Sequence, residues 1–201
     1  MLQYPSILGW KKAPIGKSCV AFNKYDGSNL RWEYSPKQGW NKYGTRRCMF
    51  DKNTPLYNQA IELFQDQMGG AIVETVNHAF GRKVERITAF TEFFGPSSFA
   101  GFHEHDEPKQ LKLFDVFVFK KGFIPPKQFA KLFGRHDWTA EVVYEGNMSR
   151  EFIEDVRNGK YPVYEGVICK GDDWTAKIKT LEFLNRLRDT HEGLWNEEKD
   201  E

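Results

Sequence analysis

Hydrophobic and polar residues alternate over short runs throughout this chain of 201 residues, and glycine or proline stands at the ends of most runs. Alternation of this kind predicts β-strands with one buried face, while hydrophobic residues at helical spacing occupy several of the intervening stretches. The predicted strands are residues 20–23, 29–34, 40–47, 85–94, 111–120, 140–144, 161–170 and 174–180, and the predicted helices are residues 54–67, 71–80, 125–133, 149–158 and 181–188.

Local signals mark the ends of the predicted helices. Thr54-Pro55 suits the N-cap and first position of the helix over 54–67, and Gly69-Gly70 is expected to end it. Ser149 is expected to cap the helix that follows it. Residues 1–18 are rich in breakers and are expected to be irregular. The residues expected on the buried side of the first helix are Leu56, Ala60, Leu63 and Phe64.

These elements lack the regular strand–helix rhythm of a parallel α/β protein. We therefore predict an α+β fold with antiparallel sheets and flanking helices. No internal repeat or low-complexity linker divides the sequence, so residues 1–201 are expected to form a single domain. The end of the chain, residues 191–201, carries five acidic residues and one lysine and is expected to fray.

The composition narrows the class of protein. The 17 Phe, 8 Tyr and 6 Trp residues suffice for a sizeable core, and neither a membrane-spanning run nor a signal-peptide pattern is present. The 3 scattered cysteines, Cys19, Cys48 and Cys169, predict reduced core thiols of a cytosolic protein. Residues 1–50 hold nine Lys or Arg against two acids. This excess suggests a polyanionic partner, although charge runs are also common on solvated faces.

The hydrophobic run at 19–22 leads directly into Asn23, Lys24, Tyr25 and Asp26-Gly27. Strand lysines usually lie on wet edges and Asp-Gly usually forms a hairpin turn, so one interpretation is a surface lysine beside a turn. The other interpretation is that Lys24 is a nucleophile, because an amine in a partly dry, cation-rich pocket can attack at neutral pH.

Other polar residues lie inside or at the ends of predicted strands. Glu92, among aromatic residues, either faces water or requires a hydrogen bond or ion pair. Phe114, next to Asp115, is either a core residue or a stacking platform for a base. Glu165 directly precedes a hydrophobic segment, at a position where a metal ligand would fit.

Pairs of cationic residues have two interpretations as well. Lys177 and Lys179 share one face of a strand, so both can reach one phosphate or both can face water. Arg46 and Arg47 follow the flexible Gly44-Thr45 and have the same two interpretations. The segment 103–107 contains two histidines and three acids, but nearly adjacent ligands chelate a metal poorly, so a solvated loop is predicted.

In their order along the chain, these segments resemble the motifs of the covalent nucleotidyltransferases, the superfamily of polynucleotide ligases and mRNA capping enzymes. The nucleophile motif Lys-x-Asp-Gly is matched by Lys24-Tyr25-Asp26-Gly27. The later motifs are matched, in order, by Lys42-Tyr43-Gly44-Thr45-Arg46, Glu92-Phe93-Phe94-Gly95, Phe114-Asp115, Glu165-Gly166-Val167 and Lys177-Ile178-Lys179. The resemblance spans nearly the whole chain and implies a ligase-type adenylation domain without an OB domain.

The resemblance also implies a role for each matched residue. Lys24 would attack the α-phosphate of ATP and carry AMP, while Lys177 and Lys179 would neutralise phosphate charge. Glu165 would be the ligand of Mg²⁺ or Mn²⁺, and Asp26 would act in transfer to the nucleic-acid strand. The remaining nucleotide contacts implied are the backbone around Asn23 on the base edge, Tyr25 beside it, Glu92 on the ribose, Phe114 stacked on adenine, Asn29 in the metal's hydration shell, and Arg46 or Arg47 on phosphate or the incoming strand.

Four segments are similar to those of compact phage and bacterial RNA ligases: Tyr4-Pro5-Ser6-Ile7, Ser28-Asn29, 37–47 and 95–102. This similarity implies an ATP-dependent RNA ligase that joins a 5′-phosphate end to a 3′-hydroxyl end. Such an enzyme would act in RNA repair, in the cytosol of a bacterium or a phage host, with no membrane association. A small DNA ligase, a stand-alone adenylyltransferase and a catalytically silent nucleic-acid-binding module are the alternatives. The sequence does not specify the oligomeric state.

Overall fold

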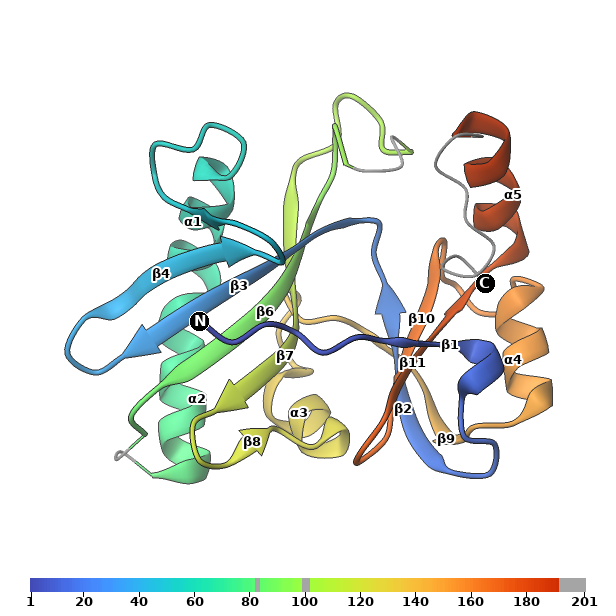
Figure 1. Cartoon of the computed structure of the whole chain (residues 1–201), viewed down its shortest axis with the longest axis horizontal. Helices are drawn as coiled ribbons and strands as arrows, with labels where there is room; N and C mark the ends of the chain where they lie inside the picture. The colour runs from blue at the N-terminus through green and yellow to red at the C-terminus, as the bar shows by residue number, and fades with distance from the viewer. Residues whose placement is uncertain (82–83, 99–101, 192–201) are drawn as a thin grey trace. The chain divides into compact units, whose positions relative to one another are not determined.

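The computed structural model describes residues 1–81, 84–98 and 102–191, and these group into two compact units (Figure 1). Unit 1 comprises Met1–Tyr4, Gly27–Ile124 and Lys131–Thr139, and unit 2 comprises Pro5–Asp26, Pro125–Ala130 and the chain from Ala140 onward. The chain passes between the two units five times. The expectation that residues 1–201 form a single domain stays a prediction. The tail expected to fray lies, from residue 192, outside the described residues, as does part of the 95–102 loop.

Unit 1 is built on an antiparallel sheet of six strands in the order β5-β4-β3-β6-β7-β8. The strands are β3 (Gly27–Ser35), β4 (Gly39–Thr45), β5 (Met49–Phe50), β6 (Ile87–Phe94), β7 (Gln110–Val118) and β8 (Gly122–Phe123). The predicted strands over 29–34, 40–47, 85–94 and 111–120 are confirmed, with ends shifted by up to two residues.

Helices α1 (Asn58–Phe64) and α2 (Gly70–Phe80) cover one face of this sheet (Figure 1). The indole of Trp32, on β3, stacks on the Phe64 ring with centroids 4.2 Å apart and planes 7° apart. Its Nε1–H also donates to the Thr91 hydroxyl on β6, at 2.9 Å. Trp32 and Phe64 are fully buried, so this pair is the centre of the core of unit 1.

Three expectations for the first helix are wrong. The Thr54 hydroxyl hydrogen-bonds with Asp51 in a turn, the helix begins only at Asn58, and Leu56 is 57% exposed. Gly69-Gly70 does not end the helix, because a π-helical turn (Gln65–Gly69) joins α1 to α2. The Trp40 indole is the reason for a glycine at position 69. Its Nε1 donates to the Gly69 carbonyl at 2.9 Å, and a Cβ on residue 69 would lie 3.1 Å from that nitrogen.

Unit 2 is built on a sheet of five strands in the order β1-β11-β10-β2-β9. The strands are β1 (Leu8–Gly9), β2 (Ser18–Lys24), β9 (Val142–Asn147), β10 (Gly166–Lys170) and β11 (Thr175–Lys179). All pairings are antiparallel except the short β1–β11 pair. Two expectations for unit 2 are corrected. Residues 1–18 include β1 and a 3₁₀ turn (Trp10–Lys12), and the strand expected over 161–170 begins only at Gly166. Pro162 lacks an N–H and is the central residue of a tight turn, in which the Val163 N–H donates to the Tyr161 carbonyl at 2.8 Å.

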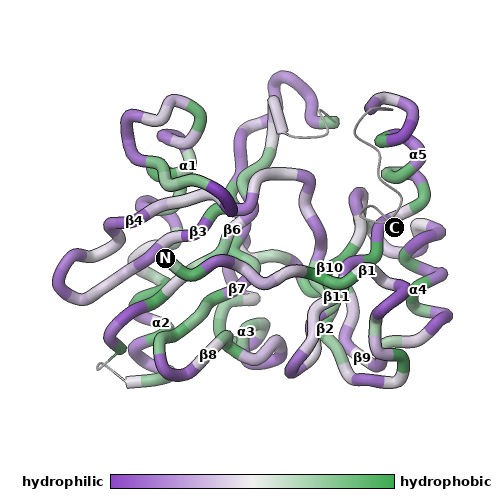
Figure 2. Tube along the Cα trace, viewed as in Figure 1, coloured by the Kyte–Doolittle hydropathy of each residue, from purple (hydrophilic) through white to green (hydrophobic). Residues whose placement is uncertain are grey.

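Helix α4 (Arg150–Arg157) packs on this sheet and closes the core of unit 2. The predicted cap is confirmed, because the Ser149 hydroxyl accepts from the Phe152 N–H at 3.0 Å. Helix α5 (Leu181–Thr190) follows β11, and α3 (Pro126–Phe133) contributes residues to both units. Figure 2 shows that β10 is hydrophobic along most of its length, whereas the β3–β4 turn is hydrophilic. Among the described residues, none of the helices is long and apolar enough to cross a membrane.

Candidate active site

Three adjacent strands of unit 2 bring the motif lysines together. In the antiparallel register, Gly166 of β10 lies opposite Lys24 of β2 on one side and opposite Lys179 of β11 on the other. Directly opposite residues of a sheet project to the same face, so Lys24 and Lys179 flank the glycine on one face. Lys177 precedes Lys179 by two residues and therefore shares that face. The structure thus brings Lys24 to the sheet face of Lys177 and Lys179, which are distant from it in the sequence.

Glu165 connects these lysines. Its Oε1 lies 2.6 Å from the Lys24 Nζ and 4.0 Å from the Lys179 Nζ, and its side chain is 6% exposed. Burial raises the pKa of the Glu165 carboxyl, although the charges of Lys24 and Lys179 oppose the shift. Thr180 fixes the backbone here, because its N–H donates to the Glu165 carbonyl and its hydroxyl donates to the Tyr164 carbonyl. Sequence reasoning missed this ion pair, since it assigned Glu165 to a metal alone.

The opposite face of the same strands explains why the lysines point where they do. Ala21, Val167, Cys169, Ala176 and Ile178 alternate with the site residues and are buried in the core beneath α4. Alternation therefore directs every second side chain of β2, β10 and β11 into this core and the others away from it. Cys19 and Cys169 belong to this buried set as free thiols, as predicted, whereas Cys48 is exposed, so its predicted place in a core is wrong.

The rest of the nucleophile motif lies next to Lys24. The Asn23 N–H donates to the Glu141 carbonyl at 2.9 Å, which holds the end of β2. Burial, together with the charge of Glu141, raises the pKa of Tyr25 to about 12, so its phenol is neutral at physiological pH. The negative charge of Asp26 acts on the Glu165 carboxyl and favours its protonated form. Asn23, Tyr25 and Asp26 therefore surround the lysine–carboxylate pair.

Two motif glycines are required by close backbone approach. Gly166 has φ +147°, and a Cβ at this position would overlap the carbonyl oxygen of Ile178. Within unit 1, a Cβ on Gly27 would lie 2.5 Å from the Phe93 carbonyl oxygen. Only glycine fits at either position without a backbone shift.

The buried carboxylate offers one position to a divalent cation. Glu165 Oε2 is buried and has no hydrogen-bond partner within the described part of the chain. No group of three or more His, Cys, Asp or Glu side chains among the described residues could hold a metal by itself. One carboxylate oxygen fits Mg²⁺ or Mn²⁺, since such ions are often held by one or two carboxylates together with substrate phosphates and water.

Unit 1 contains the other predicted nucleotide contacts. Glu92, on β6, lies opposite Asn29 of β3 on one side and Lys112 of β7 on the other. These three polar side chains share one face of the sheet, and Glu92 is half-buried. The structure thus brings Asn29 to Glu92. The Lys112 ammonium donates to the Asp137 carbonyl. The sequence analysis did not single out Lys112; the only signal for it was its position two residues before Phe114 in the same predicted strand.

Phe114 is the extra residue of a β-bulge. The register of β6 with β7 passes from Phe90–Asp115 to Thr91–Leu113 and so skips Phe114. A bulge re-aims the side chain that it carries, and bulges are frequent next to functional sites. Phe114 is half-buried, whereas its neighbour Asp115 is buried.

The N-terminal segment supports this bulge from within unit 1. The Tyr4 ring packs edge-on against Phe114, with centroids 5.1 Å apart, and its hydroxyl donates to Asp115 Oδ2 at 2.8 Å. Burial and the Asp115 charge raise the pKa of Tyr4 well above its usual value. The guanidinium of Arg31 donates to the carbonyls of Met1 and Leu2. Sequence reasoning noted the Tyr4 segment but did not predict this contact.

We expect Tyr4→Phe to lower the free energy of unfolding by about 2 kcal/mol, because it removes a hydrogen bond to a buried carboxylate and keeps the ring packing. Urea unfolding of the full chain measures the change. Tyr57→Phe is the matched control, since the Tyr57 ring packs on Phe50 but its hydroxyl has no hydrogen bond within the described residues. Equal stabilities of the two variants would contradict the assigned contact.

Arg46 and Arg47 lie on the exposed turn between β4 and β5, where the Thr45 hydroxyl accepts from the Arg47 N–H at 3.2 Å. Both side chains are exposed, so neither contributes to the core of unit 1. The turn presents both guanidinium groups to solvent, and the choice between them stays a prediction. The 103–107 segment has a His103–Glu107 contact at 2.9 Å and no metal cluster within its described residues.

Comparisons with known proteins identify the fold. No family model and no curated protein matches the sequence. Solved structures of an RNA ligase from Naegleria gruberi do match. An apo mutant superposes with TM-score 0.70 at 14% identity, over 92% of this chain and 58% of the ligase. A complex with pyrophosphate gives TM-score 0.65 at 15% identity, over 94% and 58% of the two chains.

A mutant ligase with ATP and Mn gives TM-score 0.62 at 14% identity, over 87% of this chain and 52% of that chain. This chain therefore spans between half and three fifths of the ligases it matches. At such identities the likeness establishes the fold. The α+β fold of this chain is similar to that of the RNA ligase structures, as the motif resemblance predicted.

Proposed function

We propose that this chain is an ATP-dependent RNA ligase that carries AMP covalently on Lys24. The observation that carries the proposal is the placement of the Lys24 amine, 2.6 Å from a buried carboxylate and on the same sheet face as Lys177 and Lys179. The matched ligase structures support it, because they include complexes with ATP, AMP, Mn and pyrophosphate. AMP and pyrophosphate are the two parts into which adenylyl transfer divides ATP.

In the first step, the Lys24 Nζ attacks the α-phosphorus of ATP. A nitrogen–phosphorus bond forms, the bond from the α-phosphorus to the bridging oxygen breaks, and pyrophosphate leaves. Lys177 and Lys179 neutralise charge on the α-phosphate as it is transferred. Positioning and charge neutralisation supply most of the catalysis in phosphoryl transfer, and this part of unit 2 provides both.

The amine must lose a proton before it attacks. Glu165 Oε1 lies in hydrogen-bond contact with Lys24, and burial raises the pKa of its carboxyl, which favours a protonated state. We therefore assign Glu165 as the first acceptor of the proton from Lys24. The proton then passes to solvent, so that the carboxylate is again negative when Oε2 serves as a cation ligand. Lys179, whose Nζ lies 4.0 Å from the same oxygen, and Lys177 disfavour the charged form of Lys24 by like-charge repulsion.

Glu165 Oε2 would hold Mg²⁺ or Mn²⁺, which would supply charge neutralisation to the phosphates. Asn29 is assigned to the hydration shell of this ion. Glu92 is assigned to the ribose hydroxyls and Phe114 to the adenine ring. The backbone around Asn23 is assigned to the base edge, Tyr25 to the nucleotide, and Arg46 to the phosphates or the incoming strand.

The later steps use the AMP on Lys24 to join ends. AMP passes to a 5′-phosphate end, which gives a pyrophosphate-linked adenylate, and a 3′-hydroxyl then attacks the activated phosphate and releases AMP. Asp26, next to Lys24 in the motif, is assigned to these strand-transfer steps. RNA is the favoured substrate because the matched structures are those of an RNA ligase.

The test is covalent labelling of the full chain with ATP that carries ³²P at the α-position, in the presence of Mn²⁺. We expect label to remain on the denatured protein. No label is expected when EDTA is added before ATP, because chelation then prevents adduct formation. Nicked RNA, single-stranded RNA and nicked DNA with labelled 5′-phosphates then identify the substrate, because joining makes the phosphate resistant to phosphatase. A chain that takes no label with ATP and Mn²⁺ would refute the proposal.

Glu165→Gln is expected to weaken Mn²⁺ binding by at least about tenfold, because it removes the negative charge of the assigned metal ligand. Electron paramagnetic resonance of free Mn²⁺, with α,β-methylene ATP present, measures this affinity without requiring turnover. Glu182→Gln, which changes an exposed carboxylate at the start of α5, is the matched control. Identical Mn²⁺ affinities for Glu165→Gln and the unmodified chain would exclude Glu165 as the metal ligand.

A further inference from the structure

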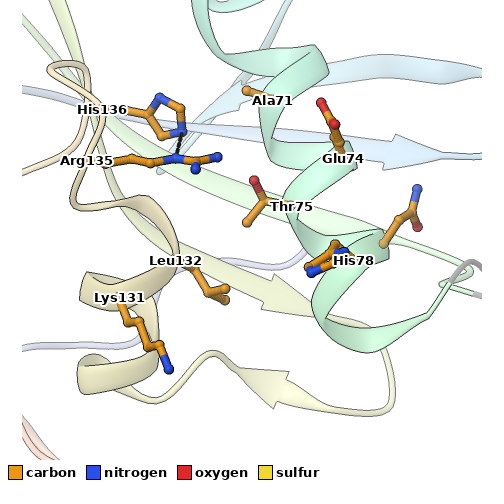
Figure 3. A pocket seen from close by; sticks show the side chains of 9 residues that line it. Ala71, Glu74, Thr75, His78, Lys131, Leu132, Arg135 and His136 are labelled. Carbon is orange, nitrogen blue, oxygen red and sulfur yellow. Dashed lines mark hydrogen bonds between the residues drawn. The ribbon is translucent and has the colours of Figure 1, made fainter.

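A hollow of about 800 Å³ lies in unit 1, away from the motif residues in sequence. Figure 3 shows that side chains of α2 form one wall, and that residues from the end of α3 and the segment after it form the other. The volume is within the range of ligand-binding pockets. The residues lining it are Ala71, Glu74, Thr75, Asn77, His78, Lys131, Leu132, Arg135 and His136.

The lining favours an anion over an apolar ligand. Lys131 and Arg135 are cations, both are exposed, and neither has a salt bridge to a carboxylate within the described part of the chain. His78 and His136 add two imidazole rings, and Thr75 and Asn77 add neutral donors. Glu74 is the single carboxylate among the lining residues. Two unpaired cations that face the same hollow leave a positive charge for a ligand to neutralise.

Arg135 is oriented by its neighbour. Its Nε donates to His136 Nε2 at 3.4 Å (Figure 3), and the His136 ring stacks on Trp138 with centroids 4.3 Å apart and planes 13° apart. Trp138 is buried, so this stack fixes the imidazole on the fold. The bond engages only the Nε of Arg135, and the two terminal nitrogens keep the fork geometry that suits a phosphate.

We infer that this hollow binds the sugar–phosphate backbone of RNA, as a second contact surface outside the nucleotidyl-transfer site. The donors of the hollow are of the types that contact backbone phosphates: Arg, Lys, Asn and Thr. Glu74 would repel a bare phosphate, but its carboxylate accepts a hydrogen bond from a ribose 2′-hydroxyl, which DNA lacks. The inference rests on the proposed function for the identity of the nucleic acid.

The test uses the full chain and a fluorescein-labelled, nicked RNA duplex without a 5′-phosphate, so that no joining occurs. We expect the double variant Lys131→Ala/Arg135→Ala to weaken binding about tenfold or more, and to lower the slope of log affinity against log salt by one to two. The matched control is Lys120→Ala/Lys121→Ala, which removes two charges from the turn between β7 and β8 of the same unit. The control is expected to bind within about twofold of the unmodified chain, as rim or surface charges that contact no phosphate contribute little.

Further measurements separate the sources of phosphate. Glu74→Ala is expected to lower the ratio of RNA affinity to DNA affinity. Full displacement of the RNA by millimolar inorganic phosphate, at constant ionic strength, would overturn the backbone assignment in favour of a small-phosphate site. Wild-type affinity and salt slope in the double variant, or an equal loss in the control, would also overturn it.

Labelling with α-³²P ATP distinguishes this inference from the proposed function. The double variant is expected to form the lysyl adduct at the unmodified rate, because its substitutions lie outside the adenylation motifs. Loss of RNA binding with intact adduct formation supports both proposals. If the unmodified chain forms no adduct, the proposed function fails, and RNA binding still tests the hollow independently.

Discussion

Lys24→Arg is expected to abolish covalent labelling by α-³²P ATP, with a loss of at least about a thousandfold. The guanidinium keeps the positive charge that faces Glu165, but it stays protonated and cannot act as the nucleophile. Lys24→Ala is expected to abolish labelling too, with a loss of stability as well, because it leaves the buried Glu165 carboxylate without its partner at 2.6 Å. The arginine variant therefore separates the chemistry of the amine from its structural role.

Lys160→Ala is the matched control for these variants. Lys160 also pairs with a carboxylate, that of Asp155 at 2.6 Å, but its side chain is 66% exposed. Its loss is expected to leave labelling unchanged. Peptide mapping of the labelled wild-type chain should place the AMP on the peptide that contains Lys24. Wild-type labelling of Lys24→Arg, or a label on another lysine, would refute the assigned nucleophile.

Gly166→Ala is expected to lower the free energy of unfolding by about 3 kcal/mol or more, because strain at a positive φ adds to overpacking. The methyl group would overlap the Ile178 carbonyl, which belongs to the pairing between β10 and β11. Relief of that overlap requires the two strands to separate where Lys179 and Glu165 are held. The melting temperature and the extent of labelling by α-³²P ATP should therefore both decrease.

Gly159→Ala provides the comparison within unit 2. Gly159 has φ +72°, but no atom lies within 4 Å of the Cβ position, so only the backbone strain applies. We expect a cost of about 1 kcal/mol and unchanged labelling. If both alanine variants lose the same stability, steric contact with Ile178 is not the reason for glycine at position 166.

Alternation and capping signals predicted most of the strands and helices, because these signals act over a few residues. Examples are the Ser149 cap, β2, which was predicted over 20–23, and β11, which was predicted over 174–180. The errors arose where a tertiary contact overrode a local preference. Gly69 was interpreted as a helix end, but it provides room for the Trp40 indole.

The candidate site was predictable as a set of residues and only partly as a geometry. The motif order indicated Lys24, Glu165 and Lys179, but the contact between Lys24 and Glu165 depends on the register of β2 with β10. The Tyr4–Asp115 hydrogen bond joins residues separated by 111 positions. No pattern within a short window of sequence encodes such a separation.

The strand order of unit 2 has a consequence for how the chain folds. β2 pairs with β9 and β10, so the first long strand of this sheet remains unpaired until residues after Val142 are synthesised. Pairing of β2 with strands so distant in the sequence requires closure of a long loop, and the entropy lost in that closure slows folding. Unit 1, complete at Thr139, can form earlier on the ribosome, while the hydrophobic residues of β2 stay exposed. Assembly of the sheet that carries Lys24 is therefore the expected slow step, and the stage at which the chain is most prone to aggregate.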